Sequence, residues 1–84
     1  MDKTLEKQFK ELSFSDQAKW LEKNGVQLGA RTYKNQVIYL EALDHIFIES
    51  WSDINNHLIE KFEVISLADV EQNYPKLFGS VKHL

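Results

Sequence analysis

The sequence contains no cysteine, and this absence removes several kinds of chemistry at once. Without thiols the chain cannot form disulfide bonds, a thiolate nucleophile or a thiolate metal site. Small secreted domains usually depend on disulfides, whereas proteins of the reducing cytoplasm rarely contain them. We therefore expect a cytoplasmic protein.

Long apolar runs are also missing. No stretch approaches the roughly 20 consecutive apolar residues that a membrane-spanning helix needs. The first residues, MDKTLEK, are too charged for a secretory signal. We therefore expect no association with a membrane.

A strong charge of either sign is lacking as well. Ten Lys and Arg residues against 13 Asp and Glu residues give a net charge of -3, and the basic residues are spread along the chain. Nucleic acid binding depends on a clustered basic face. No nucleic acid partner is therefore expected.

Proline and glycine are few, with one and three residues, and 43% of the residues are hydrophobic. This composition is typical of a folded globular protein and not of a disordered one. At 84 residues the chain has the size of one small domain with one core. We expect a single domain over residues 1–84.

Helical periodicity marks the N-terminal part of the chain. Leu5 and Phe9 repeat at the spacing of one helix face. A second helix should begin at a cap formed by Ser13 or Ser15 and end at Gly25, because glycine readily takes the left-handed conformation that closes a helix. Helices are predicted over about 3–24.

A further helix is predicted after the middle of the chain. Ser66 and Asp69 stand in the positions of a capping box, and Pro75 follows where a helix should end. The expected helix covers about 67–75, and a tail follows over 76–84.

The middle of the chain, about 26–66, alternates between apolar and polar side chains as strands do. Gly29 predicts a β-bulge or the close approach of another backbone. The predicted fold class is α+β, with N-terminal helices, a four-stranded antiparallel β-meander and a C-terminal helix. The expected strands cover 26–33, 37–43, 46–51 and 58–65.

The pairing register depends on hairpin loop length, because a shift of one residue exchanges the two faces of a strand. An odd loop around Asp44 pairs Leu40 with Ile48, whereas a two-residue loop would pair Leu40 with Glu49 and mix the faces. We expect odd loops at all three hairpins, since they gather the apolar residues on one face that the helices mainly cover. That face carries Leu28, Ala30, Ile38, Leu40, Ala42, Ile46, Ile48, Phe62 and Val64.

The opposite face would then carry large aromatic rings among charged residues, with Glu49 opposite Lys61. Three interpretations are open for this aromatic face: a second small core under another segment of the chain, a surface for a protein partner or self-association, and a platform for a small ligand. The candidate partner-binding residues are Arg31, Tyr39, Phe47, Glu49, Trp51 and Ile59.

Four segments of the chain carry a resemblance to known proteins: LGARTY at 28–33, VIYL at 37–40, FIESW at 47–51 and IEKF at 59–62. The succession resembles a group of short uncharacterised bacterial proteins with a helix, a Leu-Gly-x-Arg strand and a strand with acidic and Trp residues before an Asn-containing hairpin. The resemblance covers about the middle half of the chain. It implies a small α+β domain and no particular activity.

Signatures of metal binding and catalysis are weak. His45 and His57 lie in hairpin loops with Asp44 and Asp53, a combination that can hold a metal. The two loops fall at opposite ends of the predicted sheet, so neither a metal nor any other cofactor is expected.

Three carboxylates, those of Glu41, Glu49 and Glu63, fall on the predicted aromatic face, where they could meet for acid–base chemistry. A ladder of charges with Arg31 and Lys61 is the simpler interpretation. No catalytic residue is predicted.

The sequence thus predicts a non-catalytic binding or protein-interaction module that uses the aromatic face or an open edge of the sheet, with a homodimer as the simplest assembly. One alternative is a small enzyme or enzyme accessory that uses a sheet-face carboxylate such as Glu49. A nucleic-acid-associated regulator is the third hypothesis.

Overall fold

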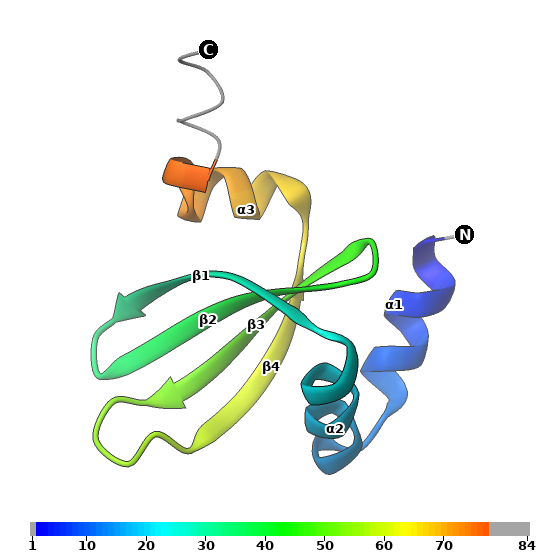
Figure 1. Ribbon diagram of the computed structural model, residues 1–84, viewed down its shortest axis with the longest axis horizontal. Coiled ribbons are helices and arrows are strands. Elements are labelled where there is room, and N and C mark those ends of the chain that lie inside the picture. The colour runs from blue at the N-terminus through cyan, green and yellow to red at the C-terminus, as the bar shows by residue number, and fades with distance from the viewer. Residues whose placement is uncertain (1, 78–84) are drawn as a thin grey trace.

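The computed structural model describes residues 2–77, which form three helices and one sheet. The predicted α+β class is confirmed (Figure 1). Residues 75–77 have helical backbone as well, and the remainder of the predicted tail lies outside the described residues. The elements are α1 (Asp2–Glu11), α2 (Phe14–Asn24), β1 (Val26–Tyr33), β2 (Gln36–Leu43), β3 (Ile46–Asp53), β4 (Ile59–Ile65) and α3 (Leu67–Asn73).

The predicted helix caps are largely present. The Ser13 hydroxyl accepts a hydrogen bond from the backbone N–H of Asp16 at 3.1 Å and begins α2. Ser66 and Asp69 form the reciprocal capping box that begins α3. These side chains accept hydrogen bonds from N–H groups that have no partner within the first turn of a helix.

Gly25 ends α2 in a different way from the one predicted. Its backbone is extended, with φ -78° and ψ 151°, and is not left-handed. The chain passes directly from Asn24 into β1, so no reversal of direction is needed. Glycine is required here for space, because a Cβ atom would lie 2.7 Å from the carbonyl oxygen of Leu21.

The four strands form an antiparallel meander in the order β1-β2-β3-β4. A register shift between Gln27 and Gly29 confirms the predicted bulge in β1. The turns after β1 and β2 contain two residues each, and the first residue of each, Lys34 or Asp44, has a φ near +55°. The prediction of odd loops is therefore wrong at these two hairpins.

The two-residue turns shift the register by one position. Leu40 therefore pairs with Glu49. Between β3 and β4 the register differs from the predicted one by two positions, so Glu49 pairs with Glu63 and not with Lys61. The predicted single apolar face is accordingly divided between the two sides of the sheet, since directly opposed residues share a side. Of the residues predicted for that face, Ala30, Ile46, Ile48, Phe62 and Val64 lie on one side and Ile38, Leu40 and Ala42 on the other.

Each side of the sheet has its own core. The helices α1 and α2 pack on the Ile48 side, where the buried residues are Phe9, Leu21, Leu43, Ile46 and Ile48. The helix α3 packs on the Leu40 side, where Leu40, Val70 and Tyr74 are buried against Phe47 and Ile65. The prediction that the helices mainly cover the Leu40 side is therefore wrong for α1 and α2, which lie away from α3 in Figure 1.

Within residues 2–77, no helix combines the length and the apolar character required to cross a membrane.

Because each side of the sheet has its own core, a deletion in either core should destabilise the protein. Leu40 and Ile48 are both fully buried, on opposite sides of the sheet. Leu40→Ala and Ile48→Ala should each lower the free energy of unfolding by about 2–5 kcal/mol, because each leaves a cavity. Chemical denaturation followed by circular dichroism measures the loss.

Glu63→Ala is the control, since this side chain is exposed and its removal should cost less than about 0.5 kcal/mol. A large loss for only one of the two core variants would contradict the two-core arrangement.

Candidate functional site

The six predicted site residues do not share a surface. Arg31, Phe47, Glu49 and Trp51 lie on the α3 side of the sheet, whereas Tyr39 and Ile59 lie on the α2 side. The predicted grouping into one aromatic face is therefore wrong. The two-residue turn after β2 moves Tyr39 to the α2 side, and the register shift between Trp51 and Ser52 moves Ile59 there. The two groups are best described separately.

Glu49 is the centre of the group on the α3 side, and its side chain is 2% exposed. Arg31 donates hydrogen bonds from Nε and Nη2 to the two carboxylate oxygens, at 3.0 and 3.3 Å. The Tyr74 hydroxyl donates to Oε2 at 2.7 Å. This Glu49 cluster, of Arg31, Glu49 and Tyr74, joins β1 and β3 to the residue that follows α3.

The Glu49 cluster shifts the protonation equilibria of its members. Burial of the Tyr74 hydroxyl, together with its hydrogen bond to the negatively charged Glu49, raises the pKa of Tyr74 above its ordinary value of 10.0. Burial alone would lower the pKa of Arg31, but the hydrogen bonds and charge of Glu49 outweigh this effect and raise it. Both pKa shifts favour the protonated forms of Arg31 and Tyr74, which donate the hydrogen bonds to Glu49.

Trp51 lies beside the Glu49 cluster and is held by cations from two strands. The Arg31 guanidinium lies 5.5 Å from the ring centroid, and the Lys61 ammonium lies 4.4 Å from it. Tyr33 meets the ring edge-on with centroids 6.2 Å apart. The indole N–H is buried and has no acceptor among the described residues. These contacts give Trp51 a packing role in the sheet.

Phe47 packs against the core formed with α3. Of the three interpretations of the aromatic residues, a second small core therefore describes the part of the α3 side near Phe47. The C-terminal segment supplies the cover, as one of the alternatives expected.

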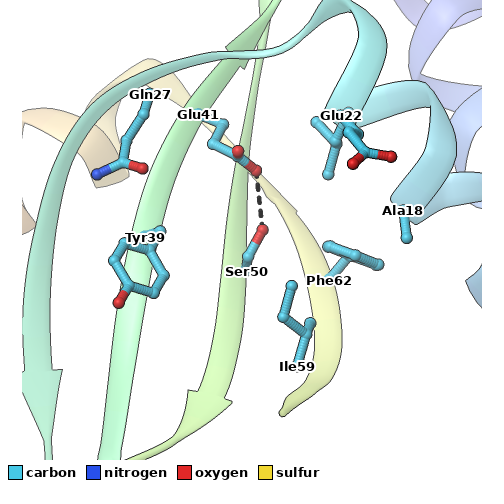
Figure 2. A pocket seen from close by; sticks show the side chains of 9 residues that line it. Ala18, Glu22, Gln27, Tyr39, Glu41, Ser50, Ile59 and Phe62 are labelled. Atoms are coloured by element: carbon cyan, nitrogen blue, oxygen red, sulfur yellow. Dashed lines mark hydrogen bonds between the residues drawn. The ribbon is translucent and has the colours of Figure 1, made fainter. Parts of the chain in front are cut away.

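Tyr39 and Ile59 lie at a pocket on the α2 side of the sheet, with a volume of about 430 Å³. Figure 2 shows side chains from all four strands and from α2 projecting toward this space. We call it the α2 pocket. Its lining residues are Ala18, Leu21, Glu22, Gln27, Tyr39, Glu41, Ser50, Ile59 and Phe62.

The α2 pocket arises from helix spacing and strand alternation. Ala18, Leu21 and Glu22 are three and four residues apart on α2, so they share one face of the helix. Tyr39 and Glu41 alternate along β2, and Ser50 lies opposite Tyr39 on β3. The sheet thus forms one wall and the helix the other.

The α2 pocket combines apolar walls with carboxylates. The Ser50 hydroxyl donates a hydrogen bond to Oε1 of Glu41 at 2.9 Å, which orients that carboxylate (Figure 2). Glu22 reaches the same space from the helix. Among the described residues that line the pocket, none is Lys or Arg. The arrangement therefore suits a group that carries positive charge on an apolar stem.

The carboxylates considered for acid–base chemistry are not brought together. Glu41 lies on the α2 side, whereas Glu49 and Glu63 lie on the α3 side. The loop residues are also separated, because Asp44 and His45 form one turn and His57 belongs to the hairpin at the other end of β3. Within residues 2–77 no cluster of three potential ligands could hold a metal ion.

Sequence reasoning missed most of the α2 pocket. Glu22, Gln27 and Ser50 line the pocket but are not among the site residues that the sequence predicts. The signal available in the sequence was the i, i+3, i+4 set at Ala18, Leu21 and Glu22, which marks one helix face but not the strand residues opposite it.

In comparisons with protein-family models, with curated proteins and with solved structures, the chain has no match. The sequence and the geometry therefore carry the functional argument.

The raised pKa of Tyr74 predicts a pH dependence of stability. Because the folded state holds this proton more tightly than the unfolded chain, the stabilisation is complete below the unfolded pKa of about 10 and is lost as the pH rises above it. Tyr74→Phe should lower the free energy of unfolding at neutral pH by about 1–3 kcal/mol, because buried Glu49 loses a hydrogen bond. The variant should also lose stability less steeply above pH 10, as denaturation at several pH values would measure.

Tyr39→Phe, on the α2 side of the sheet, is the matched control for removal of a tyrosine hydroxyl and should leave the free energy of unfolding at neutral pH close to the wild-type value. An unchanged slope in Tyr74→Phe would show that Tyr74 does not hold its proton in the folded state.

Proposed function

We propose that the protein is a non-catalytic protein-interaction module whose α2 pocket receives an Arg or Lys side chain of a partner protein. The observation that carries this proposal is an open concave surface with two carboxylates, apolar walls and no basic residue in its described lining. Long basic side chains have the matching composition, with an aliphatic stem and a charged end.

The apolar part of the α2 pocket would receive the stem. Ile59 is exposed on the edge strand β4 and Phe62 is half-buried, so both offer apolar surface to an incoming chain. The head group would lie near Glu41 and Glu22. Arginine fits best, because its planar fork can bind a carboxylate through two parallel hydrogen bonds.

Support for binding over catalysis comes from the placement of the polar groups. Glu49, the carboxylate considered for an enzyme, is enclosed and hydrogen-bonded to two residues. Ser50 next to Glu41 is 3% exposed and already donates its hydroxyl proton. Acid–base chemistry in the α2 pocket would therefore have to rely on Glu22, Glu41 and the Tyr39 hydroxyl.

The test is a titration of ¹⁵N-labelled protein with Nα-acetyl-arginine methylamide, followed by NMR. The amides of Glu22, Gln27 and Glu41 should shift, with a dissociation constant on the order of millimolar, as expected for one side chain. Glu41→Gln should weaken binding up to about fivefold, since exposed ion pairs contribute about 0.2–1 kcal/mol.

Two controls accompany the titration. Nα-acetyl-norleucine methylamide has a similar stem and no charge, and it should bind less well. Glu63→Gln, on the α3 side of the sheet, should leave binding unchanged. Equal binding of the two compounds, or shifts confined to residues outside the α2 pocket, would refute the proposal.

A further inference from the structure

The free edge of β1 has little of the protection that edge strands usually carry. Within residues 2–77, β1 pairs only with β2. Val26, Leu28 and Tyr33 on this strand are exposed, and Arg31 is its one Lys, Arg, Asp or Glu residue. Natural sheets usually shield such an edge with charges, prolines or covering segments, since it can pair with another chain.

A groove runs beside this edge on the α3 side. Its volume is about 380 Å³, and it lies between Gly29–Ala30 and the segment from Asn73 to Leu77. Gly29 leaves the groove open, because a Cβ atom there would be 3.7 Å from the Tyr74 ring. We call this space the Gly29 groove.

Tyr33 has the size to fill the Gly29 groove of a second copy once its ring turns from its edge-on contact with Trp51, 6.2 Å between centroids, toward the free edge. Tyr33, Arg31 and Gly29 alternate along β1, so all three lie on the α3 side. Tyr33 is 49% exposed. If two β1 strands pair antiparallel about a two-fold axis through Arg31, Tyr33 of each copy lies directly opposite Gly29 of the other. An aromatic residue opposite a glycine is a favourable pair in sheets.

We propose that the protein forms a homodimer through β1, in which the two sheets join into one continuous antiparallel sheet and each Tyr33 ring occupies the Gly29 groove of the other copy. This surface is distinct from the α2 pocket. The proposal therefore does not depend on the function inferred for that pocket.

The charges at the centre of this pairing are complementary. The two-fold axis brings the two Arg31 side chains together, but each is bound to its own Glu49 at 3.0 Å. Two positive and two negative charges thus meet and sum to zero. A second copy of the chain is the best partner for this edge, because each copy then supplies a Tyr33 ring and a Gly29 groove that receives the other ring.

The other edge strand is less suited to this pairing. β4 carries Glu60, Lys61 and Glu63 within seven residues, and its pairing with β3 is shifted beside Glu60. Charged side chains and bulges are the usual means by which an edge avoids association. We therefore expect the dimer to form through β1 and not through β4, and an experiment can distinguish these two interfaces.

The test begins with the mass of the full chain, by sedimentation velocity from micromolar to millimolar concentration. A mass approaching twice that of one chain is expected. A monomer at all concentrations would overturn the proposal.

The chain has no cysteine, so single nitroxide labels can be placed at Thr32→Cys or Glu60→Cys. In the proposed dimer the two residues at position 32 lie within about 10 Å of each other, given a strand spacing of 4.8 Å and a rise of 3.4 Å per residue. The two residues at position 60 are separated by the strands of both sheets, roughly 30 Å. A short distance at position 60 and a long one at position 32 would assign the interface to β4 and overturn the proposal.

Variants test the contact itself. Tyr33→Ala and Gly29→Val should each raise the dissociation constant of the dimer at least tenfold, whereas Tyr33→Phe, which keeps the ring, should change it little. Gly29 does not have a positive φ, and an added Cβ atom meets ordinary contact distances. Circular dichroism checks that Gly29→Val remains folded. A dimer that both Tyr33→Ala and Gly29→Val leave intact would overturn the proposal.

Discussion

The two-residue turns at the ends of β1 and β2 are the constraint on which the rest of the structure depends. Lys34 and Asp44 take a left-handed backbone conformation there, with φ near +55°. Turns of this kind match the twist of the strands they join and leave no freedom in the pairing. They place Leu40 opposite Glu49, so apolar residues appear on both sides of the sheet and both sides need a cover. The separation of α3 from α1 and α2 follows from this register.

The same register forces a carboxylate into the interior. Burying an unpaired carboxylate is costly, and a buried ion pair seldom stabilises more than well-packed apolar residues would. Glu49 is accommodated because Arg31 and Tyr74 donate hydrogen bonds to both of its carboxylate oxygens. Arg31 remains 25% exposed, so its attraction to Glu49 is partly screened by solvent. The helix α3 has seven residues and is too short to be stable alone. The directional hydrogen bonds to Glu49 specify where it packs on the sheet.

The elements could be predicted from the sequence, but their register could not. The capping serines, the strand character of the middle of the chain and the bulge near Gly29 depend on local sequence, and the structure agrees with these predictions. The two-residue turns could not be predicted, because Lys34-Asn35 and Asp44-His45 contain no glycine to indicate a left-handed residue. β2 and β3 carry apolar residues at both odd and even positions, so the pattern accommodates either register. Tyr39 lies at the α2 pocket for this reason, and Ile59 lies there because of the register shift between β3 and β4, which the sequence pattern does not signal.

The α2 pocket and the Gly29 groove have a common origin in the small size of the chain. The short helices cover only part of each side of the sheet, and each uncovered part adjoins β1. Gln27 lines the α2 pocket and Gly29 lines the groove on the opposite side. Pairing of β1 with another strand would restrict the backbone at both residues. A ligand that needs Gln27 held in place would then bind a dimer more tightly than a monomer, and the linkage would be reciprocal, because ordering shared by two sites couples their affinities. The β1 strand is thus the element through which the two surfaces can influence each other.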